Sequence, residues 1–118
     1  MSELFSPFYE SNGLVFISGQ VGDDAESGVI PSEFEQQVSN AFNNLKLRLN
    51  EAGLSESNVA KVTIFMTDLT YFSQMNEFFA ECFGSHKPAR TTLGVAALPQ
   101  FPGDPTVLIE IEAIAVTS

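Results

Sequence analysis

The distribution of apolar residues predicts an amphipathic helix in the first half of the chain. From Ser32 to Gly53, apolar residues recur at intervals of three and four, which places them on one side of a helix. Ser32 and Glu35 have the spacing of a capping box, and Gly53 is typical of a helix end. The stripe expected to face the core consists of Phe34, Val38, Ala41, Phe42, Leu45 and Leu49. The polar residues expected to face solvent are Gln37, Asn40, Asn44 and Arg48.

A second, shorter stretch shows the same helical pattern. Residues 70–83 carry apolar side chains at helical intervals, and Gly84 is expected to end the helix. The side chains expected to face the core are Phe72, Met75, Phe78, Phe79 and Cys82.

The remaining apolar runs are short and typical of strands. Asn12-Gly13 separates two of them and supplies the positive φ angles that a tight hairpin turn requires. The expected strands are residues 4–9, 14–18, 59–67, 88–99 and 106–116. The order β-β-α-β-α-β-β predicts a single α+β domain over residues 1–118, with two helices on one face of a mixed sheet.

The last strand carries two glutamates on a face that is otherwise apolar. Because side chains alternate along a strand, Glu110 and Glu112 share a face, and both faces of the strand are expected to be buried. A carboxylate in such a place is costly unless it is paired, and Arg90 is the candidate partner. The pattern alone allows a structural salt bridge at a sheet edge or subunit contact as well as a functional site.

The charge of the chain argues against binding to nucleic acid. Five Lys and Arg stand against fifteen Asp and Glu, for a net charge of −10. The cations are scattered, without the basic cluster that phosphate backbones require, and there is no RNA-recognition motif. We therefore expect no nucleic-acid partner.

Other classes of protein are excluded on similar grounds. There is no apolar run of the length of a membrane span, so no membrane association is expected. The first residues, Met1 to Leu4, do not begin a signal peptide, and the single cysteine, Cys82, has no partner for an internal disulfide. These features predict a cytoplasmic protein.

No metal or cofactor is expected. The acidic stretch from Gly22 to Gly28 lacks the spacing of a calcium-binding loop. His86 has no companion ligands nearby and is expected to be an ordinary loop residue.

Several motifs, in order along nearly the whole chain, resemble the RidA/YjgF family. They are Ser18-Gly19-Gln20, the run from Val62 to Leu69, the run from Met75 to Phe79, P-A-R-T-T from Pro88 and I-E-I-E-A-I-A from Ile109. Members of this family hydrolyse reactive enamines and imines, and older names describe them as translation initiation inhibitors or L-PSP endoribonucleases. The resemblance implies a chorismate-mutase-like fold and a homotrimer with sites in the clefts between subunits.

The resemblance also implies roles for individual residues. Arg90 aligns with the arginine that binds the substrate carboxylate, and Glu110 with the glutamate that positions water. Ser18 and Asn76 align with residues that line the site, and Thr92 stands where close relatives often have cysteine. The implied reaction is hydrolytic deamination of 2-aminoacrylate-type enamines and imines to 2-oxo acids and ammonia.

Two departures from the family pattern bear on substrate range. Ser6-Pro7-Phe8 replaces a motif that ends in tyrosine, so Phe8 keeps an aromatic wall without the hydroxyl, unless Tyr9 supplies it. The loop from Gln100 to Pro105 is longer than the usual short turn. Because the hydroxyl is missing, a second possible function is a trimer that binds small carboxylates without turnover. The older family names add a less favoured third function, that of an endoribonuclease or translation inhibitor.

Overall fold

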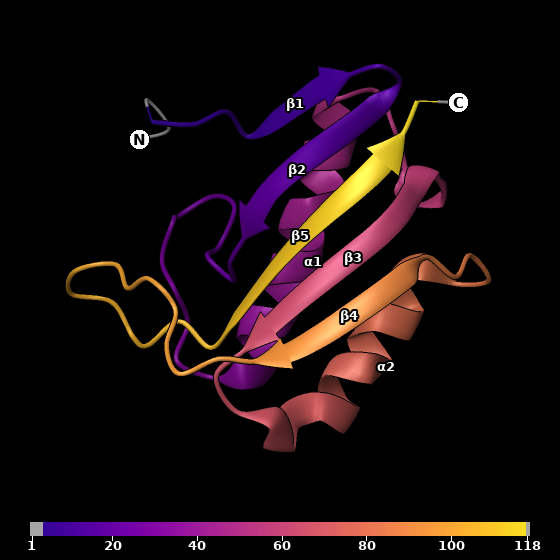
Figure 1. The fold of residues 1–118 in the computed structure, drawn as a ribbon. Helices are drawn as coiled ribbons and strands as arrows, with labels where there is room; N and C mark the ends of the chain where they lie inside the picture. Colours follow the sequence, from indigo (N-terminus) through magenta and orange to yellow (C-terminus); the bar gives the residue numbers. More distant parts are fainter. Residues whose placement is uncertain (1–3, 118) are drawn as a thin grey trace.

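The computed structural model describes residues 4–117, so the expectation about a signal peptide, which rests on Met1 to Leu4, falls mostly outside the described part. The chain forms one five-stranded sheet and two helices, which confirms the predicted order of elements (Figure 1). The strands are β1 (Phe8–Ser11), β2 (Leu14–Gln20), β3 (Val59–Met66), β4 (Ala89–Gly94) and β5 (Ile109–Val116). The helices are α1 (Phe34–Glu51) and α2 (Phe72–Phe83), with short 3-10 turns η1 (Glu56–Asn58) and η2 (Leu69–Tyr71).

The strands lie in the order β1-β2-β5-β3-β4, so the last strand in sequence occupies the centre of the sheet (Figure 1). Neighbouring strands are antiparallel except β3 and β4, which are parallel and connected through α2. The predicted hairpin is confirmed, since Asn12 and Gly13 both have positive φ, 54° and 79°.

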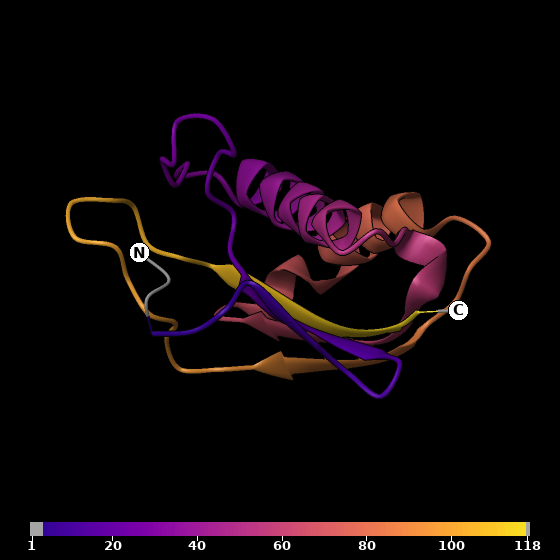
Figure 2. The same cartoon turned by 90° about the horizontal axis from the view of Figure 1, so that it is seen from above.

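Both helices cover the same face of the sheet, as predicted (Figure 2). We call the other side the open face. In β5, alternate residues from Ile109 to Ala115 are buried against the helices, whereas Glu112 is exposed on the open face. The expectation that both faces of this strand are buried is therefore wrong for the single chain, because no element of residues 4–117 covers the open face.

Helix α1 ends as predicted but begins differently. Gly53 has φ of 78°, and the Leu54 amide donates to the Leu49 carbonyl at 2.8 Å, which is the Schellman arrangement. The predicted capping box is wrong, because the N-cap is Glu33 and its side chain makes no capping hydrogen bond. The N-cap is therefore one residue later than the Ser32 position that the capping box predicts.

The prediction of a solvent-facing polar side on α1 is wrong for Gln37 and Asn44, which are buried. The Gln37 side chain bonds three backbone groups, the carbonyls of Pro31 and Thr106 at 2.8 Å each and the amide of Leu108 at 2.8 Å. The Gln37 amide therefore fastens the segment before α1 and the segment before β5 to the helix. Gln37 and Asn44 are buried because irregular segments of the chain cover this side of α1.

No helix within residues 4–117 has the length and apolar character needed to span a membrane.

Candidate functional site

Arg90 lies on the edge strand β4 and points to the helix-covered face. It pairs with Val62 of β3, a fully buried residue, and paired residues share a face. Its Nη1 donates a hydrogen bond to Oδ1 of Asn76 on α2, at 2.8 Å. Its guanidinium carbon lies 4.8 Å from the ring centroid of Phe79 and 5.5 Å from that of Phe72. We call these four residues the Arg90 site.

The Arg90 site keeps most of the guanidinium available. Among residues 4–117, Arg90 forms no ion pair, so the predicted salt bridge with Glu110 or Glu112 is not present within the chain. Phe72, expected in the core, is 39% exposed because it lies over the guanidinium at the sheet edge. A planar cation held by aromatic faces and one amide oxygen retains donors for a carboxylate.

Thr92 follows Arg90 on the same face of β4, opposite the buried Ile64 of β3. Its Oγ1 is buried and makes no hydrogen bond with any described residue. A buried hydroxyl without a partner is costly, and this one is two residues from the guanidinium.

Glu110 belongs to a second group of residues, on the open face. A pocket of ≈ 580 Å³ lies beside it. The pocket is lined by Phe5, Ser18, Gly19, Val21, Pro99, Phe101, Glu110 and Glu112. We call it the Glu110 pocket. It combines one polar wall from β2 and β5 with one apolar wall from the segments that flank the strands.

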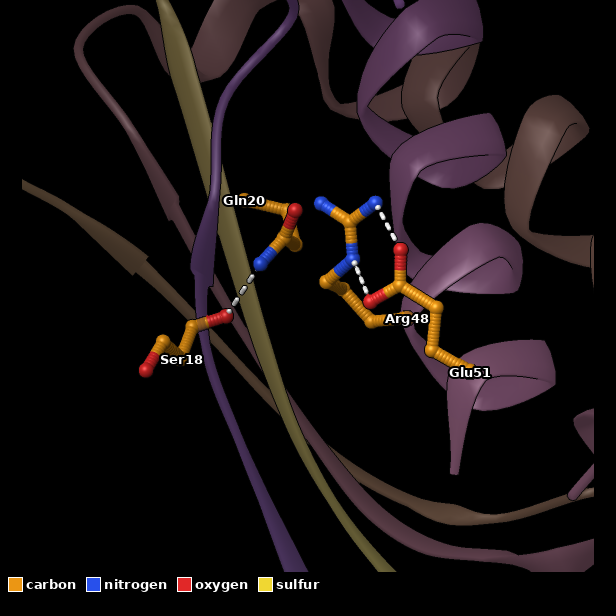
Figure 3. A network of polar contacts seen from close by, with 4 residues as sticks. All are labelled: Ser18, Gln20, Arg48 and Glu51. Atoms are coloured by element: carbon orange, nitrogen blue, oxygen red, sulfur yellow. Dashed lines mark hydrogen bonds and ion pairs between the residues drawn. The ribbon is translucent and has the colours of Figure 1, made fainter. Parts of the chain in front are cut away.

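Burial and a neighbouring charge both shift the pKa of the Glu110 carboxyl. Partial burial raises the pKa of Glu110 above its ordinary value, and the nearby charge of Glu112 raises it further. Ser18 Oγ donates to the Ser6 carbonyl at 2.6 Å, which leaves its oxygen free to accept. Figure 3 shows the Ser18 hydroxyl pointing away from α1, while the Gln20 side chain turns toward the helix and donates to the Ser18 carbonyl at 2.9 Å.

Gly19 also forms part of the site, although no role was predicted for it from the sequence. A Cβ built on Gly19 would overlap the carboxylate of Glu110. The pairing of β2 with β5 shifts register between Ile17 and Gln20, which brings this stretch of backbone close to Glu110. A glycine inside a strand pattern is a known signal of such a close approach and could have identified it.

The structure places the sequence-predicted residues in two groups rather than one. Asn76 and Thr92 accompany Arg90 at the helix-covered face, whereas Ser18 accompanies Glu110 at the open face. Strand β3 separates β4 from β5, and the two charged side chains project from opposite sides of the sheet. Within one chain, they cannot contact one small molecule together.

Phe8 does not line the Glu110 pocket. It pairs with Ile17, which is 3% exposed on the helix-covered face, and it packs against the core. The aromatic wall is supplied instead by Phe5 and Phe101, which no pattern in the sequence indicated. Tyr9, on the opposite side of β1 from Phe8, is 67% exposed.

Other candidate groups have structural partners. His86 Nε2 lies 2.7 Å from the Val59 carbonyl, as expected for a loop residue. Asp24 Oδ1 accepts from the amides of Glu26 and Ser27, which lowers the pKa of Asp24 and stabilises its own turn. Burial raises the pKa of Cys82 to about 11. In the described part of the chain, no three His, Cys, Asp or Glu side chains gather as metal ligands would.

Known proteins resemble this chain over almost all of its length. The profile of the family described as endoribonuclease L-PSP matches residues 2–117. A RutC family protein of Aquifex aeolicus is 42% identical over 114 residues, which cover 95% of this chain and 87% of that protein. TdcF of Escherichia coli, provisionally named a reactive intermediate deaminase, is 38% identical over 108 residues, 89% of this chain and 80% of TdcF.

Solved structures agree with the fold. The structure of E. coli TdcF with bound serine superposes with a TM-score of 0.87 at 35% identity, over 97% of this chain and 88% of that one. RidA from an Antarctic Psychrobacter superposes with a TM-score of 0.89 at 33% identity, over 98% and 90%. The predicted YjgF-like fold is confirmed. The chain belongs to the endoribonuclease L-PSP family, in which the RidA/YjgF resemblance of its motifs also places it.

Proposed function

We propose that this protein is a hydrolytic deaminase that converts reactive enamine and imine carboxylates to 2-oxo acids and ammonia. The observation that carries the proposal is a carboxyl of raised pKa, Glu110, on the wall of a pocket of ≈ 580 Å³. A partly buried carboxyl whose pKa is raised can accept a proton from water and return it to the substrate, as this hydrolysis requires. The name of the similar protein TdcF supports the same class of reaction.

We further propose a homotrimer in which each site is shared between two copies. Arg90 and Glu110 project from opposite faces of the sheet, so the Arg90 site of one copy has to meet the Glu110 pocket of another. The open face of the sheet offers the surface for this contact, with Leu14, Phe16 and Leu93 exposed on it. The assembly would also cover the apolar side chains that a single chain leaves in water.

In the proposed mechanism, Arg90 binds the substrate carboxylate. Its guanidinium is held by Asn76 and Phe79, and its remaining N–H groups can donate two parallel hydrogen bonds. These contacts orient the C=N carbon toward the Glu110 pocket of the neighbouring copy.

Glu110 then moves protons between water and the substrate nitrogen. An enamine substrate first takes a proton from solvent at its terminal carbon and becomes the protonated imine. The Glu110 carboxylate accepts a proton from water as the water oxygen bonds to the imine carbon. The protonated Glu110 returns that proton to nitrogen, and the C–N bond breaks as ammonia leaves. The hydroxyl of the addition intermediate gives its proton to the Glu110 carboxylate as the C=O bond of the 2-oxo acid forms.

The test couples an amino-acid oxidase to the purified protein, with semicarbazide trapping free imine. Wild-type protein is expected to reduce the trapped imine, and Arg90→Ala to abolish that effect while remaining folded and assembled. Arg48→Ala is the matched control, because Arg48 pairs with Glu51 on α1 (Figure 3) and lines neither the Arg90 site nor the Glu110 pocket. Unchanged imine hydrolysis by Arg90→Ala, in an assembly of normal size, would overturn the proposal.

A second candidate function is binding of a small carboxylate without turnover. TdcF, similar in sequence and fold, was solved with bound serine, and Phe8 lacks the hydroxyl of the motif that it resembles. Stabilisation against heat by a 2-oxo acid would fit both functions; the trapping assay separates them, because a binding protein would leave the imine intact. The ribonuclease implied by the family description is disfavoured, since a net charge of −10 repels RNA.

A further inference from the structure

The apolar wall of the Glu110 pocket indicates which substrates fit it. We infer that the protein prefers 2-imino acids with bulky branched-aliphatic or aromatic side chains over small ones such as those derived from the three-carbon 2-aminoacrylate. This inference rests on the proposed function and specifies its substrate. The side chains that carry it are Phe5, Val21, Pro99 and Phe101, which line the pocket next to Ser18, Gly19 and Glu110.

The pocket is large for the smallest imines. At ≈ 580 Å³ in the single chain, it has room for ligands much larger than three carbons. A small imine bound at Glu110 would leave the aromatic wall in contact with water, so it would gain nothing from that wall. A branched or aromatic side chain would displace this water, which is the main source of affinity in apolar pockets.

Two separate segments build the apolar wall. Phe5 comes from the chain before β1 and is 51% exposed, and Phe101 comes from the loop between β4 and β5 and is 37% exposed. Figure 2 shows this loop and the N-terminal segment on the same side of the molecule, beyond the end of the sheet. Two exposed phenylalanines beside the proposed reacting group form a surface that an apolar side chain would cover.

The loop that carries Phe101 is held in place rather than loosely attached. The Gln100 side chain donates to the Leu98 carbonyl at 2.6 Å and accepts from the Val107 amide at 3.0 Å, which ties together the two ends of the loop. The Asp104 amide donates to the Phe101 carbonyl at 3.0 Å and closes a turn at Phe101. A wall fixed before the substrate arrives loses less entropy on binding.

The negative charge of the pocket further restricts which side chains a substrate can carry. Glu112 lines the same pocket as Glu110, and the protein has a net charge of −10. A substrate with an acidic side chain would place a third carboxylate next to these two. Imines derived from acidic amino acids are therefore expected to be poor substrates.

The test measures kcat/KM for imines that oxidases generate from alanine, leucine, phenylalanine and glutamate. Wild-type protein is expected to favour the leucine- and phenylalanine-derived imines over the alanine-derived one by about tenfold or more, because each buried methylene contributes roughly that factor. Phe101→Ala and Phe5→Ala are expected to remove this preference, with kcat/KM falling several-fold more for the leucine- and phenylalanine-derived imines than for the alanine-derived one. Val29→Ala is the matched control, since Val29 is 53% exposed and does not line the pocket.

A variant that fills the pocket provides a second test that remains informative if the alanine variants do not fold. Phe101→Trp retains an aromatic side chain in the loop and is expected to lower kcat/KM for the phenylalanine-derived imine more than for the alanine-derived one. Hydrolysis of all imines with the alanine-derived one preferred, or equal losses for every imine in the Phe101 variants, would overturn the substrate inference alone. Failure to hydrolyse any imine would instead overturn the proposed function.

Discussion

The carboxylate of Glu110 lies against the backbone of Gly19, so closely that a Cβ at Gly19 would overlap it. Gly19 follows Ser18, whose hydroxyl is tied to Ser6, and the register between β2 and β5 shifts here. The backbone therefore occupies space that water would otherwise fill on one side of the carboxylate. Loss of water is the main reason that the pKa of Glu110 is raised.

Gly19→Ala is expected to displace the Glu110 carboxylate and reduce imine hydrolysis. The end of the glutamate side chain can rotate away from a methyl group, so the free energy of unfolding should change by no more than about 1 kcal/mol. A small misplacement of a catalytic group has a much larger effect on rate, and kcat/KM should fall by about tenfold or more.

Steady-state kinetics and thermal denaturation of the same preparation check this prediction. Gly94→Ala is the control, because its Cβ would meet the Leu69 side chain and not Glu110. Equal losses of activity in both variants would show that the effect is not specific to the contact with Glu110.

Glu110→Gln is expected to stabilise the protein at neutral pH and not in acid. Because the pKa of Glu110 is raised by burial and by Glu112, the folded chain binds this proton more tightly than the unfolded chain does. The free energy of unfolding therefore falls as pH rises from the ordinary glutamate value through the folded-state pKa, and this loss then remains at higher pH. Glutamine carries no charge, so the variant avoids the loss.

Thermal denaturation at pH 4 and at pH 7 measures this difference. The gain in Tm from Glu110→Gln should be present at pH 7 and shrink toward pH 4. Glu112→Gln should give a smaller gain at pH 7, since it removes only the second cause of the raised pKa. A gain of the same size at both pH values would contradict the prediction.

Local elements were predictable from the sequence because their determinants are local. The Asn12-Gly13 turn, the apolar stripe of α1 and the glycine at the end of that helix each depend on a few neighbouring residues. The placement of Arg90 and Glu110 on opposite faces of the sheet was not predictable. The face that Arg90 occupies depends on the parallel pairing of β4 with β3, and no local pattern specifies that pairing.

Polar residues on α1 were misassigned for a related reason. Gln37 and Asn44 fit the polar side of an amphipathic helix, and the sequence does not reveal that irregular segments cover that side. Phe5 and Phe101 are the reverse case, since apolar residues in loops give no periodic signal. Position in the folded chain, rather than residue type, decides the role of each.

Gln37→Ala is expected to be strongly destabilising, unlike the same change at its neighbour. The buried Gln37 amide bonds the carbonyls of Pro31 and Thr106 and the amide of Leu108, and alanine would leave all three backbone groups without these partners. Since each buried polar group left unpaired costs about 1 kcal/mol or more, the free energy of unfolding should fall by roughly 3 kcal/mol. Urea denaturation measures this change.

Gln36→Ala is the matched control, because Gln36 is an exposed residue of the same helix. It should change the free energy of unfolding by less than about 0.5 kcal/mol. Similar effects of the two substitutions would mean that the Gln37 hydrogen bonds contribute little to stability.

Mixing two inactive variants tests whether the site is shared between copies. Arg90→Ala keeps the Glu110 pocket, and Glu110→Gln keeps the Arg90 site, so each variant alone should be inactive in the proposed mechanism. If the two are unfolded and refolded together in equal amounts, some contacts join an intact Arg90 site to an intact Glu110 pocket. Random assembly of a cyclic oligomer makes about one quarter of the sites complete, so about a quarter of wild-type activity should return.

The outcome depends on the opposite placement of the two side chains on the sheet. If Arg90 and Glu110 of one chain served the same substrate, every site in the mixture would carry one of the two substitutions, and no activity would return. Refolding each variant separately and then combining the two controls for activity that arises without exchange of subunits. A double variant, Arg90→Ala with Glu110→Gln, refolded with wild-type protein, should leave about one quarter of the sites intact if they are shared, and about one half if each site lies within one chain.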